Sequence, residues 1–425
     1  MELKKYKLSD VAKVDISSID KKTKENETPV KLCNFTDVYH NWAITKELSS
    51  SFMEASANSK EIEKFTIKKG QVAFTKDSET RDDIGIPTYI ADDFDKVLLG
   101  YHCALITPND KKLSGKYLNA FMHSTFIHKY FELNATGSGM RYTLSLDTLE
   151  NMPLLLPSLE EQERIGEIFS TLDKKIALNR AINQNLEALA KQLYDYWFVQ
   201  FDFPNEEGKP YKSCGGAMVW NDKLKREIPE GWNNGTVGDL FATQAGYAFK
   251  SSEWKECGHP VLTIKNIQED GSVTFSDASF IDKYDCKLDK YSSNNGNMIF
   301  AMSGNTIGKI GIISSNIPNV LINQRVLIIK TNVKNIAFPY FVIKDKKIQN
   351  LVLQLGANSA QPNISEEEFR NIKICIPPKS IMDDFNQIFK DSFKKIINNR
   401  IEIDVLTKQR DELLPLLMNG QVTIE

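Results

Sequence analysis

Apolar residues recur every three or four positions along two long stretches of this chain, residues 158 to about 199 and residues 378 to about 419. This spacing places the apolar side chains on one face of a helix. Ser158 is a suitable cap for the first helix, and Glu160 and Glu161 stand in its first turn, where the helix dipole favours acids. The pattern therefore predicts two long helices, each with one apolar stripe.

The two stripes are candidates for a helix-helix interface. The first consists of Ile165, Ile168, Phe169, Leu172, Ile176, Ile182, Leu186, Leu189, Leu193 and Trp197, and the second of Phe385, Ile388, Phe389, Ile396, Leu406, Leu413 and Leu417. Two equivalent stripes on one chain are buried most simply by packing together, so we predict an antiparallel coiled coil. Helices of about 40 residues are about 60 Å long, so the pair would also be a spacer.

The register of this helix pair follows from its internal symmetry. If a pseudo-two-fold axis passes near residue 179, each position faces the repeat-equivalent of its mirror image. The pairs predicted in this way are Asn179–Asn399, Ile165–Leu413 and Leu193–Phe385. An asparagine at such a seam can fix the register at some cost in stability.

The second half of the chain repeats the first. At a displacement of 220 residues, and without a gap over residues 138–180, Ser145 stands opposite Ser365 and Pro157 opposite Pro377. Further upstream the loops differ in length, but residues 70–74 resemble 296–300, and residues 8–11 resemble 237–240. A repeat of this length indicates two similar globular modules, each followed by a long helix. Variable loops usually carry the residues that differ in binding, so we expect the two modules to recognise different targets.

Turn-forming residues divide the chain into five segments. Residues 1–157 contain short β-rich runs such as 97–99 and 103–106, a helix near residues 115–133, and a closing strand at 152–157. A turn-rich linker occupies residues 200–230. The second module, residues 231–377, closes with a strand at 372–377. The predicted fold is α+β: two similar α/β modules (1–157 and 231–377) joined by two long helices (158–199 and 378–425) in a pseudo-two-fold repeat.

Composition limits the partners and the compartment. The 425 residues carry a formal net charge of −3, which argues against indiscriminate binding of polyanions but leaves room for a local basic face. Six scattered cysteines without a C-x-x-C pair indicate free thiols in a reducing cytoplasm, and five histidines show no metal-ligand spacing. We find neither a signal region nor a stretch that could span a bilayer, so we expect a cytoplasmic protein without a metal.

Signatures of catalysis are missing from the sequence. It contains no dinucleotide-binding or phosphate-loop motif, no H-E-x-x-H, no G-x-S-x-G and no Asn- or Asp-Pro-Pro-aromatic tetrapeptide of DNA amino-methyltransferases. Residues 304–309 look like a phosphate loop, but the spacing is wrong and no clear helix follows. We interpret them as a tight turn that presents polar backbone and Lys309 to a partner. Catalysis is therefore expected to belong to another chain.

Several segments resemble the specificity subunit of type I restriction-modification enzymes. They are the helix start at 156–165, its continuation at 172–180, the linker motifs at 203–213 and 228–232, and the second-module segments 246–251, 301–309 and 323–326. The resemblance covers essentially the whole chain, including its order of module, helix, module, helix. The first module departs from the pattern, because its turn at 75–81 lacks the glycines of 304–308 and Gly100-Tyr101-His102 replaces Asn323-Gln324-Arg325.

The resemblance implies a non-catalytic DNA specificity subunit. Each module would be a target-recognition domain that reads one half of a split, asymmetric site on double-stranded DNA. The helices would set the gap and dock two modification subunits, which bind S-adenosylmethionine and methylate adenine; restriction subunits driven by ATP would join them. This chain would bind neither cofactor. Two unlike readers on a rigid spacer should indeed recognise two unlike half-sites. The alternatives are a self-sufficient DNA-binding regulator, disfavoured without a helix-turn-helix, zinc module or basic charge, and a coiled-coil protein scaffold.

Candidate DNA contacts in the second module are polar residues at corresponding turns. They are Lys250, Asn305, Thr306, Lys309, Asn323, Gln324, Arg325, Ser359 and Gln361. Amide and guanidinium groups can bond base edges in pairs, while lysines suit phosphates. The alternative is that these groups form bonds within ordinary turns and loops.

The first module supplies counterparts at equivalent places. They are Lys76, Arg81, Tyr101, His102, Ser138, Met140, Arg141 and Tyr142. Small residues around 137–139 allow close backbone approach, and Arg141 could present a fork to a base edge or a phosphate. A lone histidine such as His102 is more often a packed ring than a reader.

Overall fold

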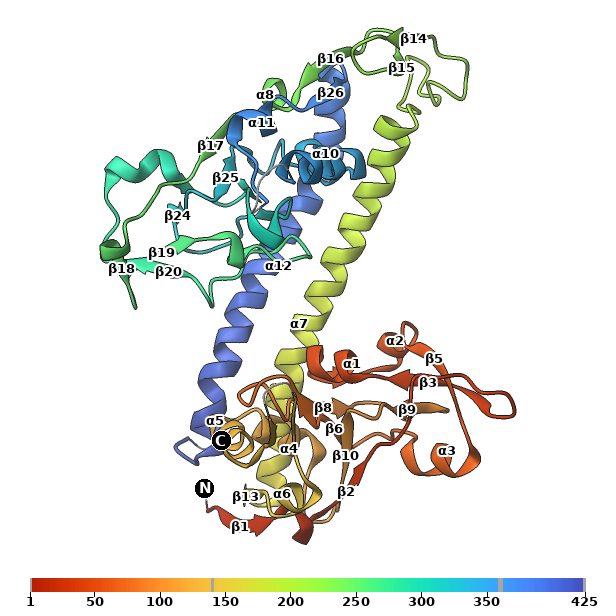
Figure 1. Ribbon diagram of the computed structural model, residues 1–425, viewed down its shortest axis with the longest axis vertical. Coiled ribbons are helices and arrows are strands. Elements are labelled where there is room, and N and C mark those ends of the chain that lie inside the picture. Colours follow the sequence, from red (N-terminus) through yellow and green to blue (C-terminus); the bar gives the residue numbers. More distant parts are fainter. Residues whose placement is uncertain (1, 139–140, 358–361, 423–425) are drawn as a thin grey trace. The chain divides into compact units, whose positions relative to one another are not determined.

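The computed structural model describes residues 2–138, 141–357 and 362–422. The chain forms two compact units, which are described separately. Unit 1 comprises Met1–Ala177 and Val405–Glu425, and unit 2 comprises Leu178–Asp404. Both long helices, α7 (Leu159–Tyr194) and α12 (Lys379–Met418), therefore contribute to both units (Figure 1).

Unit 1 is built on a five-stranded sheet. The strand order is β2 (Ala12–Ile16), β10 (Cys103–Pro108), β6 (Val72–Thr75), β8 (Pro87–Ile90) and β4 (Ala43–Ile44). The central strand β6 is buried along its whole length. Its alternate residues point to opposite faces of the sheet. Val72 and Phe74 enter one hydrophobic cluster and Ala73 enters another. The sheet is thus covered on both faces.

Smaller sheets and short helices complete unit 1. The sheets are β5 (Met53–Ala57), β3 (Thr28–Cys33) and β9 (Val97–Leu99); β11 (Thr136–Ser138), β12 (Arg141–Thr143) and β7 (Asp77–Ser78); and the pair β1 (Lys4–Lys7) with β13 (Pro153–Leu156). The helices are α1 (Phe35–His40), α2 (Lys46–Ser49), α3 (Ser59–Phe65), α4 (Gly115–Met122), α5 (Thr125–Asn134), α6 (Leu146–Glu150) and the 3-10 turn η1 (Leu8–Asp10). The helix expected near residues 115–133 is thus two helices, since Ser124 caps a new one by accepting from the Ile127 N–H.

Unit 2 repeats this plan. A four-stranded sheet has the order β17 (Thr243–Ala245), β25 (Val326–Ile329), β22 (Met298–Ala301) and β23 (Ile310–Ile312). A second sheet has the order β18 (Trp254–Lys255), β20 (Ser279–Ile281), β19 (His259–Leu262), β24 (Val320–Ile322) and β21 (Ser292–Ser293), and β16 (Asn233–Thr236) pairs with β26 (Lys373–Ile376). The helices are α8 (Val237–Leu240), α9 (Ala337–Lys344), α10 (Lys346–Gly356) and α11 (Glu366–Arg370), with short turns η3 (Ser251–Glu253), η4 (Ile264–Asn266), η5 (Cys286–Tyr291) and η6 (Gly304–Thr306).

Equivalent hydrogen bonds confirm the internal repeat. The Ser145 hydroxyl accepts from the Thr148 N–H at the start of α6, and the Ser365 hydroxyl accepts from the Glu368 N–H at the start of α11. The central strands also match, because β22 alternates between two hydrophobic clusters as β6 does. The repeat seen in the sequence is therefore a repeat of topology and of capping.

The two long helices run antiparallel within unit 2. Near one end the Tyr194 and Phe385 rings lie 6.1 Å apart, and further along the Asn399 Nδ2 donates to Asn183 Oδ1 at 2.8 Å. Asn179 in turn donates to Glu402. The predicted partner of Asn399 was Asn179, so the observed register differs by four residues, one helical turn. A shift of one turn keeps each apolar stripe facing its partner, which is why the stripes alone do not select the register.

Most predicted interface residues are buried, but two stripe positions are not. Ile165, Phe169, Ile176, Asn179, Phe385, Phe389, Ile396, Asn399 and Leu406 are buried, and Leu172, Leu186, Leu193 and Leu413 are half-buried. In unit 1, Ile165 and Phe169 share a cluster with Leu417 of α12. The side chains of Leu189 (57% exposed) and Ile388 (52% exposed) face outward, so including them in the buried stripes was wrong.

The segment between the modules is more ordered than the sequence indicated. After α7 the chain makes a π-helical turn, η2 (Asp195–Val199), and then a hairpin of β14 (Met218–Asn221) and β15 (Arg226–Pro229). Phe201 and Phe203 from this segment are buried against Trp232, with ring centroids 5.3 and 5.2 Å away. Residues 200–230 are therefore part of the unit 2 core as well as a connection.

Candidate nucleic-acid interface

The candidate residues of module one meet where strand β6 ends and β10 begins. The Lys76 N–H donates to the His102 carbonyl at 2.9 Å, and the Leu144 N–H donates to the Lys76 carbonyl at 3.0 Å. Strand β7 pairs with β12, which continues the hairpin from β11. A Cβ at Gly137 would lie 2.1 Å from the Arg141 carbonyl oxygen, so this hairpin requires glycine there. We name this edge of unit 1 reading edge 1, after the role that the sequence led us to expect; it comprises residues 75–81, 100–102 and 141–144.

A buried carboxylate organises the cations of reading edge 1. Asp77, whose side chain is 8% exposed, accepts hydrogen bonds from Lys76 Nζ at 2.8 Å and Arg141 Nη2 at 2.6 Å, and its Oδ2 lies 2.7 Å from His102 Nδ1. Burial on its own raises the pKa of the Asp77 carboxyl, but the hydrogen bonds from Lys76, His102, Thr143 and Arg141 outweigh it and hold that pKa well below its ordinary value. Asp77 is therefore ionised at neutral pH.

Aromatic rings lie beside these cations. The Tyr101 and His102 rings lie 3.7 Å apart, and the Arg81 guanidinium lies over the Tyr142 ring at 5.1 Å from its centroid. Tyr101 is 39% exposed. Arg141 Nη2 also lies 2.6 Å from His102 Nδ1. One ring nitrogen cannot donate to Asp77 and accept from Arg141 at once, so the proton on Nδ1 decides which of the two bonds forms.

Module two builds an equivalent edge with the same backbone bonds. The Met302 N–H donates to the Arg325 carbonyl at 3.0 Å, and the Ile364 N–H donates to the Met302 carbonyl at 2.9 Å. The Gly304 N–H donates to the Pro362 carbonyl at 2.9 Å. We call this edge of unit 2 reading edge 2, residues 301–309, 323–325 and 362–364. By these bonds Met302 corresponds to Lys76, Ser303 to Asp77 and Arg325 to His102.

The side chains of reading edge 2 are less tied to one another. Arg325, Gln324 and Asn305 are exposed, and the part of the chain that the structure describes offers no hydrogen-bond or ion-pair partner for the Arg325 guanidinium. The Lys309 ammonium lies 2.7 Å from a carboxylate oxygen of Glu269, which is 84% exposed. The turn at 304–309 is followed by strand β23, so it is a tight turn as predicted and not a phosphate loop.

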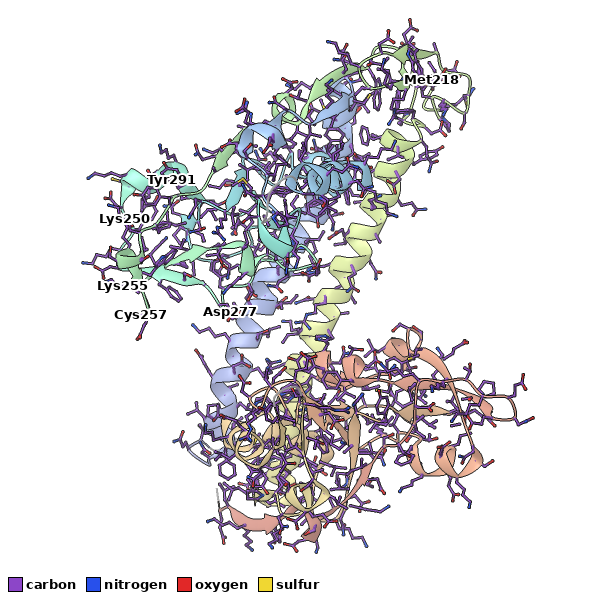
Figure 2. All side chains as sticks on the ribbon, viewed as in Figure 1. Met218, Lys250, Lys255, Cys257, Asp277 and Tyr291 are labelled. Carbon is purple, nitrogen blue, oxygen red and sulfur yellow. The ribbon has the colours of Figure 1, made fainter. Side chains whose placement is uncertain are left out.

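The remaining candidate side chains of module two differ in whether they form hydrogen bonds within the protein. Asn323 is buried, and its Oδ1 accepts from the Arg325 N–H at 3.3 Å. The Thr306 hydroxyl donates to the Ser303 carbonyl at 3.2 Å. These two side chains thus form turn bonds, which was the alternative to DNA contact. The Lys250 side chain is exposed and projects from the surface of unit 2 (Figure 2).

The structure brings together most of the residues that the sequence singled out. In module one, Lys76, Arg81, Tyr101, His102, Arg141 and Tyr142 all lie on one edge, although they come from three separate segments. Met140, Ser359, Gln361 and the side chain of Ser138 lie outside the described residues. Sequence reasoning missed Asp77. Extending the match of 70–74 with 296–300 by three residues sets Asp77 opposite Ser303, and that contrast is the signal that could have found it.

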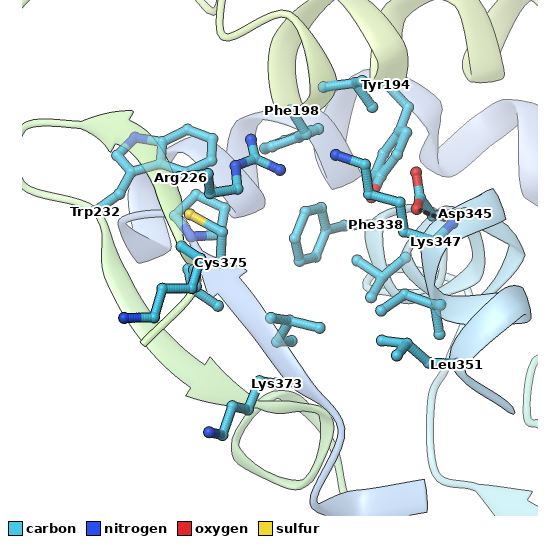
Figure 3. Close-up of a pocket in the computed structure, with 17 residues that line it drawn as sticks. Tyr194, Phe198, Arg226, Trp232, Phe338, Asp345, Lys347, Leu351, Lys373 and Cys375 are labelled. Atoms are coloured by element: carbon cyan, nitrogen blue, oxygen red, sulfur yellow. Dashed lines mark hydrogen bonds between the residues drawn. The ribbon is translucent and has the colours of Figure 1, made fainter. Parts of the chain in front are cut away.

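A cavity of about 370 Å³ lies elsewhere in unit 2 (Figure 3). The rings of Phe198, Phe338 and Trp232 line it, together with the cationic side chains of Arg226 and Lys373. Among the candidate DNA contacts that the structure describes, none lines this cavity. Within the described residues, no group of three His, Cys, Asp or Glu side chains is placed to hold a metal ion. Among those same residues, no helix has a stretch long and apolar enough to cross a membrane.

Comparison with known proteins gives a consistent result. The family model for the type I restriction modification DNA specificity domain matches residues 1–188 and 229–409. The type I restriction enzyme MjaIX specificity subunit of Methanocaldococcus jannaschii is 27% identical over 326 residues, covering 75% of this chain and 72% of the relative. The HindI specificity subunit of Haemophilus influenzae is 25% identical over 472 residues, covering 99% of each. The fold is similar to the crystal structure of the type I restriction-modification S subunit from M. genitalium, with a TM-score of 0.57, 15% identity and coverage of 98% and 96%.

Proposed function

This chain belongs to the family of type I restriction-modification DNA specificity proteins, and we propose that each of its two modules reads one half of a bipartite, asymmetric DNA site. The observation that carries this proposal is the pair of reading edges. They share their backbone hydrogen bonds but carry different polar side chains, with Lys76, Asp77 and His102 in module one where module two has Met302, Ser303 and Arg325. Equal scaffolds with unequal side chains suit two half-sites of different sequence.

The chemistry of methylation and cleavage belongs to partner subunits in this proposal. The relatives are specificity subunits, and neither repeat of this chain carries a cofactor loop in its sequence. We infer that modification subunits bind S-adenosylmethionine and methylate adenine at the site, and that restriction subunits use ATP. This chain then supplies sequence choice and binds neither cofactor.

An exposed apolar face of α7 and η2 in unit 2 supports docking of a modification subunit. Leu189 is 57% exposed, and with the half-buried Leu193 and the exposed Tyr196 it lines a shallow surface pocket. Exposed apolar groups that cluster on a helix are typical of protein-protein contact. Packing within unit 2 does not bury this face, so it is available to a partner.

A module swap tests the division of labour. Residues 231–376 are replaced with the equivalent module of a homologue, and the complex with modification subunits is expressed in cells whose methylated sites are then mapped. The expected result is a change in one half-site alone, with the other half and the gap retained, because each edge reads its own half. A swap that rewrites both half-sites would contradict the proposal.

Lengthening α7 tests the spacer role. Four residues inserted near position 179 add about 6 Å and about one turn, so the module beyond the insertion keeps its rotational setting but moves along the helix axis. We expect both half-site sequences to be retained while the gap between them changes, as measured by the same methylation mapping. Four alanines inserted into the exposed turn at 206–208, outside the helices, are the matched control and should leave the gap unaltered.

A further inference from the structure

Resting on the proposed function, we propose that Asp77 is a positioning residue that holds Arg141 and His102 as the base reader of module one, and that Arg141 reads a guanine in the first half-site. Asp77 lies below the exposed surface, while the Arg141 side chain is 58% exposed. A buried acid and an exposed guanidinium joined by a 2.6 Å bond place the cation at the surface in a defined orientation.

The bonding pattern leaves part of the guanidinium free for a ligand. Arg141 uses Nη2 to bond Asp77 and to approach His102. Its Nη1 and Nε have no partner among the residues that the structure describes. Nη1 and Nε cannot form a fork together, because Cδ lies on the edge between them. When His102 Nδ1 carries the proton it cannot accept, so one Nη2 hydrogen bonds Asp77 and the other remains. That second Nη2 hydrogen and a parallel hydrogen of Nη1 or Nε can address two acceptors in one plane. Guanine presents such a pair in the major groove, O6 and N7, and an arginine fork on these atoms is the commonest specific contact to DNA.

The arrangement is suited to reading a base more than to holding a phosphate. Phosphate binding strengthens with each positive charge, whereas here the Asp77 carboxylate lies within hydrogen-bond distance of Lys76, Arg141 and His102 and cancels one of the positive charges. Such an acid weakens attraction to phosphates and fixes the direction of the guanidinium. Asp77 thus lowers affinity for DNA in general but increases discrimination between bases. A guanidinium fixed in one direction leaves its donors unpaired when it faces a wrong base.

Module two provides an internal comparison. Ser303 stands where module one has Asp77, it is buried, and its hydroxyl has no partner among the described residues. The equivalent position therefore does not require an acid for folding. Module two has Met302 and Gln361 where module one has Lys76 and Arg141, which supports a role for Asp77 in orienting those two cations.

The test is made on the complex with modification subunits, after methylation mapping of the wild type has defined the two half-sites. Competition binding then compares duplexes that carry each single base-pair change in the first half-site. For Asp77→Asn we expect discrimination at one guanine to fall about 10- to 100-fold. Binding to a duplex without the site should not weaken, because every cation is retained. A purely structural role would instead lower binding to all duplexes together.

Further variants keep the result decisive if Asp77→Asn does not fold. Arg141→Lys retains the charge but loses the fork, so it should lose the same discrimination. Asp83→Asn removes a module-one carboxylate that is bonded to the Tyr39 hydroxyl, and it should behave as wild type. If Asp77→Asn and Arg141→Lys both still discriminate at that guanine as the wild type does, this inference is overturned while the proposed function stands. A wild-type complex that methylates no bipartite site would overturn the proposed function itself.

Discussion

The two reading edges have the same backbone and hold their cations in different ways. In module one a buried carboxylate is bonded to Lys76 and Arg141 and lies beside His102. In module two the corresponding Ser303 is neutral, and Arg325 extends from the edge without a partner among the described residues. Arg141 is therefore ordered before DNA arrives, whereas Arg325 must lose its rotamer freedom on binding, at about 0.5–1.5 kcal/mol for such a side chain. The two modules thus share a scaffold but differ in how their candidate contact side chains are held before binding.

The largest contrast is expected from truncating the two arginines. Arg325→Ala should reduce discrimination at the second half-site by about 1–3 kcal/mol without changing thermal stability, because its guanidinium has no partner in the described protein to lose. Arg141→Ala should also reduce the stability of the chain, by about 1 kcal/mol, since it removes a charge-assisted bond from the buried Asp77 carboxylate. Competition binding and thermal melting of each variant separate the two effects. Equal melting temperatures for both variants would remove the distinction between the edges.

A pH titration sharpens the same comparison. The pKa of Asp77 in the folded chain is lower than the ordinary value of about 3.9 in the unfolded chain, so the unfolded state binds more protons in acid. Its contribution to stability is complete above about pH 5 and is lost progressively as the pH falls below that, by at most about 1.4 kcal/mol per pH unit. Hydrogen exchange at pH 6 and pH 3.5 should therefore show an extra loss of protection around β7 and β12. Asp77→Asn is the control, and it should lack this extra loss.

The smallest effect concerns a lysine of module two. If Lys309 contacts a phosphate, Lys309→Ala should weaken binding to all duplexes alike and lower the salt slope by about one. Lys309 is paired with an exposed acid, so the pair itself adds little to stability. Glu269→Gln removes the acid alone and should not weaken binding. A sequence-dependent loss for Lys309→Ala would instead make Lys309 a base reader.

The elements that were predicted well depend on local patterns. The first long helix was expected over residues 158–199 and is found as α7 and η2, from Leu159 to Val199. The second was expected to end near residue 419 and ends at Met418. Apolar period, caps and turn residues act within a few positions of one another, so they can be read directly from the chain. The convergence of the candidate residues followed from the repeat, because equivalent segments of a repeated fold lie at equivalent places.

The elements that were missed depend on contacts between distant segments. The helix register was one turn out, because an apolar stripe of constant period fits several registers and the Asn183–Asn399 bond selects one. The linker was expected to be an open connection, but Phe201 and Phe203 pack on Trp232, some thirty residues along the chain. Local sequence carries no signal for such a contact.

The sequence by itself determined two similar modules, two long helices and the family to which the chain belongs, since periodicity, repeats and motifs are properties of residue order. Tertiary structure alone decided the chemistry of the reading edges. An aspartate in a polar turn is ordinarily a solvated residue. Asp77 becomes an organising acid because folding buries it among Lys76, His102 and Arg141, hydrogen-bonding side chains from three separate segments. Burial lowers the effective dielectric around that carboxylate, so its negative charge acts on the neighbouring side chains strongly enough to fix their positions.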